Sequence, residues 1–273
     1  MKGSARAVPR QGSGVYELAR AYELAFSYRN VQQEVDALVD WATACLGHAP
    51  GTALELAAGP ADHALEMARR SIEVTALDLS SAMCSRASER ATEAGVPLRV
   101  VEGDMRSFAL DRQFEMAVVL IDSTAHLLTL DDFVANLRVT GDHLVPGGCY
   151  ILEMSHPRDF LSLVPTTTTD WTIASGAERV RVRWGSQPDE APDPLDSVSQ
   201  IVQARVRVDY EVEGRLGVHT DEVIPQRLWT ATEVEAVIRL AGTFDRVGRY
   251  GSFDSIPLDS PAAWRMITVL RRR

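Results

Sequence analysis

The length, composition and charge of the chain exclude several classes of protein. Its 273 residues, 45% of them hydrophobic, suffice for a full core, and one domain with an inserted lid is the expected organisation. The 38 acidic and 28 basic residues give a formal net charge of -10, so nucleic acid is not an expected partner. No apolar run is long enough to cross a bilayer and the N-terminus lacks the apolar core of a signal peptide, which predicts a cytoplasmic protein without a membrane partner. The three cysteines lie far apart without a CxxC or Cys/His spacing, so neither disulfides nor a metal are expected.

Strand and helix patterns alternate through the first half of the chain. After a flexible start over residues 1–14, the apolar positions from Val31 to Trp41 follow helical spacing and predict an amphipathic helix. Pro60 suits the first position of the second helix, and Ser80 suits the cap of the third. This alternation predicts a mainly parallel sheet that is covered on both faces and binds ligands at the carboxyl ends of its strands. The strands are predicted over 52–56, 74–79, 98–104, 114–122 and 148–154, and the further helices over 61–70, 80–91 and 131–144.

The pattern changes after Met154. Hydrophobicity then alternates with period two, and Glu213-Gly214 is a plausible hairpin turn, which together predict an antiparallel lid. The acidic, proline-rich segment 185–196 is predicted to be a mobile loop. Thr230, with Glu233, predicts a capped helix where the chain returns to the main sheet. The lid strands are predicted over 179–184, 198–212 and 217–228, the returning helix over 230–242, and two last strands over 244–251 and 263–271.

The turn after the first strand is the first candidate for ligand binding. A backbone that turns sharply and approaches a ligand favours glycine, and only Gly59 is glycine here, so Ala57 and Ala61 fit such a turn if their φ angles are negative. A plain strand-turn-helix connection is the alternative. With Glu55 before it, the turn resembles the first motif of class I, Rossmann-like S-adenosylmethionine-dependent methyltransferases. The resemblance implies that Ala57 and Gly59 contact the cofactor and that Glu55 faces its methionine end.

Acidic residues also end the second and third strands. Asp78, 23 residues after Glu55, suits hydrogen bonds to both ribose hydroxyls of an adenosine cofactor, although a charge at a helix N-terminus is the alternative. Family resemblance implies that Asp104 and the backbone of Met105 bind the adenine. A solvated turn aspartate is the alternative for Asp104. Two further residues beside Asp78 are expected in cofactor contact, namely Leu79 and Met83.

The loop after the fourth strand supplies a candidate base. Ile121, Asp122 and Ser123 are expected to line the methionine portion of the cofactor. The loop is similar to that of amino-sugar N-methyltransferases of antibiotic pathways, in which a histidine stands beside the methyl acceptor. His126 is therefore the candidate general base and acceptor contact, since its unperturbed pKa lies near neutrality. A structural histidine is the alternative.

The fifth strand ends in two more candidate catalytic residues, Glu153 and His156. Either one suits positioning or deprotonating an acceptor, and either one equally suits anchoring the lid through a buried ion pair. Arg158 is a candidate ligand for a substrate carboxylate, or for an acidic neighbour.

Aromatic residues complete the expected site. Tyr16, Tyr22 and Tyr28 precede the first predicted helix, and the family resemblance implies an N-terminal cover in which such rings contact the cofactor sulfonium through cation-π attraction. For Tyr22 and Tyr28 the alternative is that the rings only pack a helix against the sheet. Tyr16 is also a candidate catalytic residue. Arg227 and Trp229, where the lid rejoins the core, are candidate substrate contacts.

These observations predict an α/β fold and a methyltransferase. The resemblance implies a seven-stranded, mostly parallel, doubly wound sheet with one reversed edge strand, an N-terminal helical cover and an antiparallel β lid. The implied reaction transfers a methyl group from S-adenosylmethionine to a small molecule of natural-product metabolism and releases S-adenosylhomocysteine, without a metal. An NAD-dependent oxidoreductase is an alternative, although the turn lacks GxGxxG and Pro60 removes one donor for a pyrophosphate. A non-catalytic cofactor-binding regulator is another, and a homodimer is left open. The expected parts are the core and cover over 15–155, the lid over 156–228 and the rest of the core over 229–273.

Overall fold

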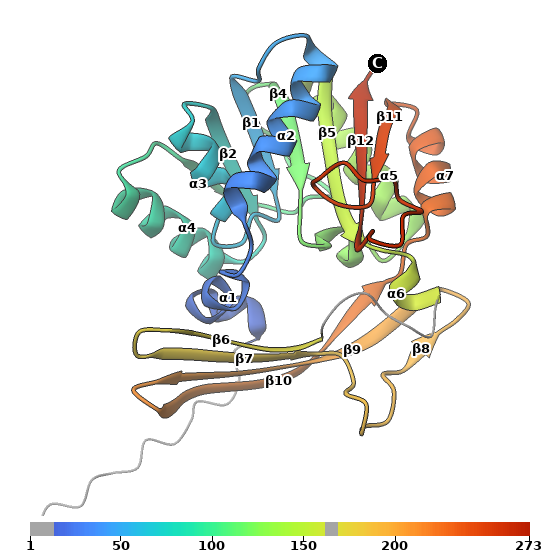
Figure 1. The fold of residues 1–273 in the computed structure, drawn as a ribbon. Coiled ribbons are helices and arrows are strands. Elements are labelled where there is room, and N and C mark those ends of the chain that lie inside the picture. Colours follow the sequence, from blue (N-terminus) through green and yellow to red (C-terminus); the bar gives the residue numbers. More distant parts are fainter. Residues whose placement is uncertain (1–13, 162–168) are drawn as a thin grey trace, which may run out of the picture.

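Seven strands form the central sheet of the protein. In the computed structural model, which describes residues 14–161 and 169–273, their order is β11-β12-β5-β4-β1-β2-β3 (Figure 1). β12 pairs with β5 and β11 in the antiparallel sense, and the pairs among the other five strands are parallel. The predicted seven-stranded, mostly parallel sheet is therefore confirmed, with β12, next to the edge strand β11, as the reversed strand. The strands are β1 (Thr52–Leu56), β2 (Glu73–Asp78), β3 (Arg99–Glu102), β4 (Phe114–Val119), β5 (Leu144–Ser155), β11 (Phe244–Tyr250) and β12 (Arg265–Arg272).

Helices cover both faces of this sheet, as a doubly wound fold requires. One apolar layer joins the sheet to α2 (Val31–Leu46), α3 (Asp62–Arg69) and α4 (Ser81–Ala94). The other joins it to α5 (Leu130–Asp142) and α7 (Ala231–Ala241). The central strands β1 and β4 are buried almost throughout, because helices cover both of their faces.

Two of the predicted helix caps are confirmed and one helix start is not. The Ser80 hydroxyl accepts from the Met83 N–H, and Thr230 with Glu233 forms a capping box at α7. Pro60, however, does not begin α3. That helix starts at Asp62, because Ala61 adopts a left-handed conformation (φ +65°) as its N-cap.

Two strand boundaries of the central sheet differ from the sequence pattern by three residues or more. β4 ends at Val119 instead of residue 122, because Ile121 and Asp122 turn into the left-handed region. β5 begins at Leu144, where α5 was predicted to end, and it runs through Pro146. Apolar composition alone does not record where a strand leaves its sheet.

The predicted antiparallel lid is present as a second sheet of order β10-β9-β7-β6, with the short β8 paired to β9 (Figure 1). Glu213 and Gly214 both have positive φ in the hairpin between β9 and β10, as a tight turn of this kind requires. β6 was not predicted. The strands are β6 (Asp170–Ser175), β7 (Glu178–Trp184), β8 (Leu195–Asp196), β9 (Ile201–Val212) and β10 (Arg215–Arg227).

Segment 185–196, expected to be a mobile loop, is held on the lid sheet by its acidic side chains. Asp193 accepts from the backbone N–H groups of Ser186 and Arg205 at 3.0 and 3.2 Å. Glu190 forms an ion pair with Arg207, which is buried beneath it. Two of the acidic residues that suggested a solvated loop thus bind the lid, Glu190 through an ion pair and Asp193 through backbone N–H groups.

A short N-terminal cover lies between the central sheet and the lid. It comprises the 3-10 turn η1 (Val15–Glu17) and helix α1 (Ala19–Phe26), as Figure 1 shows. Its apolar side chains pack against the inner face of the lid in a cluster separate from the two layers of the core. After β5 the chain makes one further helical turn, α6 (Arg158–Leu161). Among the described residues, no helix has both the length and the apolar character needed to span a membrane.

Candidate active site

The turn after β1 is a strained backbone that lies beneath the N-terminal cover. Ala57, Gly59 and Ala61 have φ angles of +51°, +54° and +65°, so the negative φ that would suit the two alanines is not found. Each alanine in this region costs roughly 1 to 2 kcal/mol, and strain of this kind is typical of functional sites. A Cβ atom on Gly59 would lie 3.7 Å from Cε1 of Tyr22, so the ring of α1 packs directly over the turn.

Asp78 ends β2 and joins this turn to the start of α4. Its Oδ2 accepts from the Gly59 N–H at 2.7 Å and its Oδ1 accepts from the Ser80 N–H at 2.8 Å. Burial raises the pKa of Asp78, and the backbone N–H groups of Ser80 and Gly59 oppose that shift. Because a carboxylate has about four acceptor positions, two remain for hydroxyl donors. A carboxylate that can accept in this way fits the hydroxyl groups of a ribose.

Glu55 lies deeper than the turn. It is 3% exposed, its Oε2 accepts from the Ala64 N–H at 2.7 Å, and its Oε1 lies 3.7 Å from Nδ1 of His63. Burial raises the pKa of Glu55 to about 7, although the charge of His63 and the Ala64 N–H act in the other direction. The carboxyl group therefore contacts the N-terminus of α3.

The other expected adenosine contacts lie around the ends of β2 and β3. Asp104 is half-buried and forms an ion pair with Arg106 at 2.6 Å, which holds the pKa of this carboxyl below its usual value. The carbonyl of Met105 accepts from the side chain of Asn136. Met83 is buried in α4, whereas Leu79 is exposed.

The turn after β4 is the second strained segment at this edge. Ile121 and Asp122 have φ angles of +53° and +57° in succession, and for a β-branched residue this conformation is a genuine outlier. Asp122 accepts from both the N–H and the hydroxyl of Ser155, at 3.0 and 2.6 Å, and burial raises its pKa despite these bonds. The hydroxyl of Ser123 donates to the Leu120 carbonyl.

Tyr16 and His126 meet across the site from segments 110 residues apart. Tyr16 Oη and His126 Nε2 are hydrogen-bonded at 2.8 Å, with the rings nearly perpendicular. Burial lowers the pKa of His126 and raises that of Tyr16, so both side chains are neutral near pH 7. The bond joins η1 to η2 (Ser123–His126), the short turn that follows β4.

Glu153 lies in a buried ion network and does not face an open site. It is fully buried and contacts Arg29 at 2.9 Å and Arg265 at 3.1 Å. Its Oε2 also accepts from the N–H of Ile121, which fixes the strained turn. Burial favours the neutral acid, but the charges of Arg29 and Arg265 prevail and lower the pKa of Glu153. The predicted buried ion pair exists, but it anchors the α1–α2 connection and β12 instead of the lid.

His156 and Arg158 are occupied by neighbouring backbone groups. His156 Nε2 bonds the carbonyl of Leu258 at 2.9 Å, and its Nδ1 accepts from the Arg158 N–H at 3.0 Å. The Arg158 guanidinium donates to the carbonyls of Ser260 and Pro261. Both residues therefore hold the loop before β12, and both ring nitrogens of His156 are hydrogen-bonded to backbone groups.

The three remaining expected contacts are also placed by the packing. Trp229 is buried in the core, where it packs edge-on against Phe133 with ring centroids 5.0 Å apart. Arg227 lies over the Trp229 ring and donates to the carbonyl of Leu128. Tyr28, by contrast, is 57% exposed.

Several contributors to this site were not assigned from the sequence. The Ser80 hydroxyl, expected only as a cap, also donates to the Tyr16 carbonyl at 2.9 Å. Arg29 binds Glu34, which in turn contacts His63 at 2.6 Å. The sequence did contain a signal for Glu34, because this residue lies one helical turn before the buried Leu38 and so falls on the apolar stripe of α2.

Comparison with known proteins shows what this fold and part of the sequence are similar to. Residues 53–148 match a family model described as a methyltransferase domain. The solved structure of an S-adenosylmethionine-dependent methyltransferase from Clostridium acetobutylicum superposes with a TM-score of 0.75 at 16% identity, covering 94% of this chain and 98% of that one. Residues 53–148 are thus similar to the methyltransferase domain family, and the chain shares the fold of that solved structure.

Two curated relatives are amino-sugar enzymes. The chain is 30% identical over 100 residues to dTDP-3-amino-3,4,6-trideoxy-alpha-D-glucopyranose N,N-dimethyltransferase of Streptomyces venezuelae, covering 37% of this chain and 40% of that protein. It is 33% identical over 100 residues to dTDP-4-amino-2,3,4,6-tetradeoxy-D-glucose N,N-dimethyltransferase of Saccharopolyspora spinosa, covering 37% and 39%. The matched segments span about half or less of the curated relatives. These matches support neither an NAD-dependent oxidoreductase nor a non-catalytic cofactor-binding regulator.

Proposed function

We propose that this protein transfers a methyl group from S-adenosylmethionine to a small-molecule acceptor. The observation that carries the proposal is Asp78, whose carboxylate joins the Gly59 turn to the start of α4 inside the matched methyltransferase domain. When bound, the cofactor supplies an electrophilic methyl group on a sulfonium whose thioether leaves as S-adenosylhomocysteine. The protein contributes alignment of the two reactants and exclusion of water, which can supply most of the rate.

The chain offers groups for each part of the cofactor. Asp78 keeps acceptor positions for the ribose hydroxyls, and Asp104 with the Met105 N–H suits the adenine. Gly59 leaves room for close approach, because it has no side chain. The methionine portion would lie against the turns that follow β1 and β4, whose residues Glu55, Ala57, Ile121, Asp122 and Ser123 are proposed contacts.

Tyr16 and His126 are the proposed catalytic pair. Both are neutral near pH 7, so the imidazole can accept a proton from an amine or hydroxyl acceptor. An amino sugar is the proposed acceptor class, as in the two curated relatives. A cytoplasmic location and a homodimer remain expectations.

Calorimetric titration tests the cofactor assignment. We expect micromolar binding of S-adenosylmethionine and S-adenosylhomocysteine and no binding of NAD. Asp78→Ala should weaken binding of the sulfur nucleotides by about 1 to 3 kcal/mol through lost charged hydrogen bonds. Asp111→Ala, which removes an exposed carboxylate that pairs with Arg99, is the control and should bind as the wild type does. NAD binding alone, or an unaffected Asp78 variant, would overturn the assignment.

Transfer itself is tested with cofactor labelled in the methyl group and a panel of amines, hydroxyls and activated carbons. We expect label in an amine product, most readily in an amino sugar. Cofactor binding without transfer to any acceptor class would favour a regulatory binder.

A further inference from the structure

Helix α1 lies over the proposed cofactor site and between the core and the lid. Its Tyr22 ring packs over Gly59, and just before the helix the Tyr16 carbonyl accepts from Ser80. The same segment thus covers the ends of both β1 and β2.

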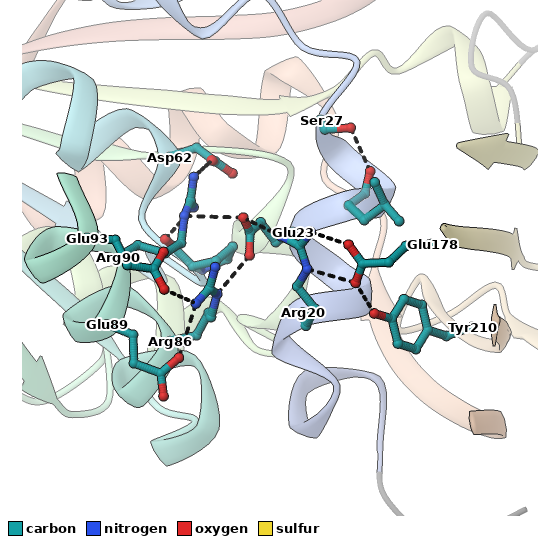
Figure 2. A network of polar contacts seen from close by, with 12 residues as sticks. Arg20, Glu23, Ser27, Asp62, Arg86, Glu89, Arg90, Glu93, Glu178 and Tyr210 are labelled. Carbon is teal, nitrogen blue, oxygen red and sulfur yellow. Dashed lines mark hydrogen bonds and ion pairs between the residues drawn. The ribbon is translucent and has the colours of Figure 1, made fainter. Parts of the chain in front are cut away.

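An ion network holds the core side of α1 (Figure 2). Glu23 of α1 contacts Arg86 at 2.8 Å and Arg90 at 3.4 Å, and both arginines project from α4. Arg90 also donates to the Pro60 carbonyl at 2.7 Å and pairs with Asp62 at 2.6 Å. The guanidinium of Arg90 therefore contacts three parts of the protein, namely the turn after β1, the first residue of α3 and Glu23 of the cover.

The lid side of α1 is held by the neighbouring Arg20. Its Nε donates to Glu178 of β7 at 3.1 Å, and its Nη1 lies 2.8 Å from Glu23. Tyr210 of β9 donates to the same Glu178 carboxylate, as Figure 2 shows. Glu23 thus stands at the point where the core network and the lid network meet.

Burial separates the strong contacts of this network from the weak ones. The side chains of Arg86 and Arg90 are each 17% exposed and that of Glu23 is 14% exposed, so their pairs are poorly screened by solvent. Glu89, which also binds Arg86, is 63% exposed, and pairs of that kind contribute little. Burial opposes ionisation of Glu23, but Arg86 and Arg90 lower its pKa, so it is charged at neutral pH.

We propose that Glu23 and Arg90 are positioning residues for cofactor binding. Arg90 fixes the turn after β1, and Glu23 holds α1 so that Tyr22 packs on that turn. The cofactor is then retained beneath a cover that is bound to α4. The inference rests on the proposed function, because the ligand is S-adenosylmethionine. Loss of the contacts of Glu23 and Arg90 should speed cofactor release while leaving the proposed catalytic pair intact.

The test compares Glu23→Gln with Glu89→Gln in the full-length protein. Glu23→Gln removes the charge but keeps the shape, and we expect the Kd for S-adenosylmethionine to rise about tenfold, or about 1.4 kcal/mol. At saturating cofactor, kcat should stay within twofold. Amide hydrogen exchange over residues 15–26 of the free protein should accelerate in this variant. Glu89→Gln should match the wild type in all three measurements.

Arg90→Lys provides a second variant should Glu23→Gln fold poorly. Lysine keeps the charge but lacks the planar fork needed to reach Pro60, Asp62 and Glu23 together, so the Kd should again rise. A Kd within twofold of wild type in folded Glu23→Gln and Arg90→Lys, with unchanged exchange over residues 15–26, would overturn the inference. If the wild type itself fails to bind the cofactor, the proposed function fails instead, and the exchange measurement still reports on the fastening of α1.

Discussion

His126 is the residue on which proton transfer to the protein would depend. Because burial lowers its pKa, the imidazole is neutral at pH 7 and hydrogen-bonded to Tyr16. We expect His126→Ala to lower kcat by about 100-fold, which is typical for loss of a general base, with cofactor Kd within twofold. The variant should also lose the fall in rate at acid pH, where the wild-type imidazole becomes protonated.

Two controls accompany this variant. Tyr16→Phe keeps the ring but removes the hydroxyl partner, and it should lower kcat less than His126→Ala does. His48→Ala removes an exposed histidine and should have the same kcat as the wild type. An active His126 variant with an unchanged pH profile would show that alignment of the reactants, and not the imidazole, provides the rate.

Glu55 predicts a pH dependence of stability with a definite sign. Its pKa is raised to about 7 in the folded protein, so between about pH 4.5 and 7 the folded state holds a proton that the unfolded chain releases. This group therefore lowers the stability of the wild type as pH rises through that window. Glu55→Gln lacks the titration and should gain about 1 to 3 kcal/mol relative to wild type between pH 5 and pH 8.

Urea unfolding of both proteins at the two pH values measures this difference, in which the titrations of all other groups largely cancel. Glu93→Gln, an exposed substitution in α4, is the matched control and should show no trend. A relative stability of Glu55→Gln that falls or stays constant over this range would contradict the assignment of the raised pKa.

Single residues differ in how far the sequence could place them. Asp78 and Asp104 were located at strand ends because the strand-helix alternation around them is local. The surroundings of His156, Arg158 and Trp229 depend on Leu258, Ser260 and Phe133, which lie about 100 residues away along the chain. Whether a polar side chain remains free for chemistry is decided by such distant partners.

At the scale of the elements, the buried Glu153 of β5 forms ion pairs that join separate parts of the core. It compensates Arg29 before α2 and Arg265 of β12. Glu153→Gln would leave two buried guanidinium groups without a full counter-charge, and we expect a loss of about 3 to 5 kcal/mol in the free energy of unfolding. Denaturant unfolding at pH 7 provides the measurement, with Glu93→Gln as the control. A loss below about 1 kcal/mol would mean that solvent or local rearrangement compensates the arginines.

The elements that the sequence predicted poorly share a physical cause. Segment 185–196 has the composition of a loop, but Glu190 forms an ion pair with Arg207 of β9 and Asp193 accepts from the backbone N–H of Arg205. The turn at Ala57 and Ala61 has the composition of a relaxed connection, yet both residues adopt positive φ. In each case contacts outside the segment override its local preference.

At the scale of the whole molecule, alternation of strands and helices was sufficient to predict the central sheet and a lid. It did not predict that η1 and α1 would supply one side of the lid core. The buried valines of the lid sheet pack against residues such as Val15, Leu24 and Ala25 of the cover. The lid therefore shares its only apolar cluster among the described residues with the cover, which is fastened in turn to α4.

This shared cluster predicts that core and lid unfold together. If the cover detaches, the inner face of the lid loses its apolar partner, so a folded lid on an unfolded core should not persist. Differential scanning calorimetry should show one transition with an enthalpy of about 190 kcal/mol, from roughly 0.7 kcal/mol per residue near 60 °C. S-adenosylhomocysteine should shift that whole transition upward, because it binds only the folded state. Two separated transitions, of which the ligand moves only one, would show that the lid is an independent unit and that α1 does not couple it to the core.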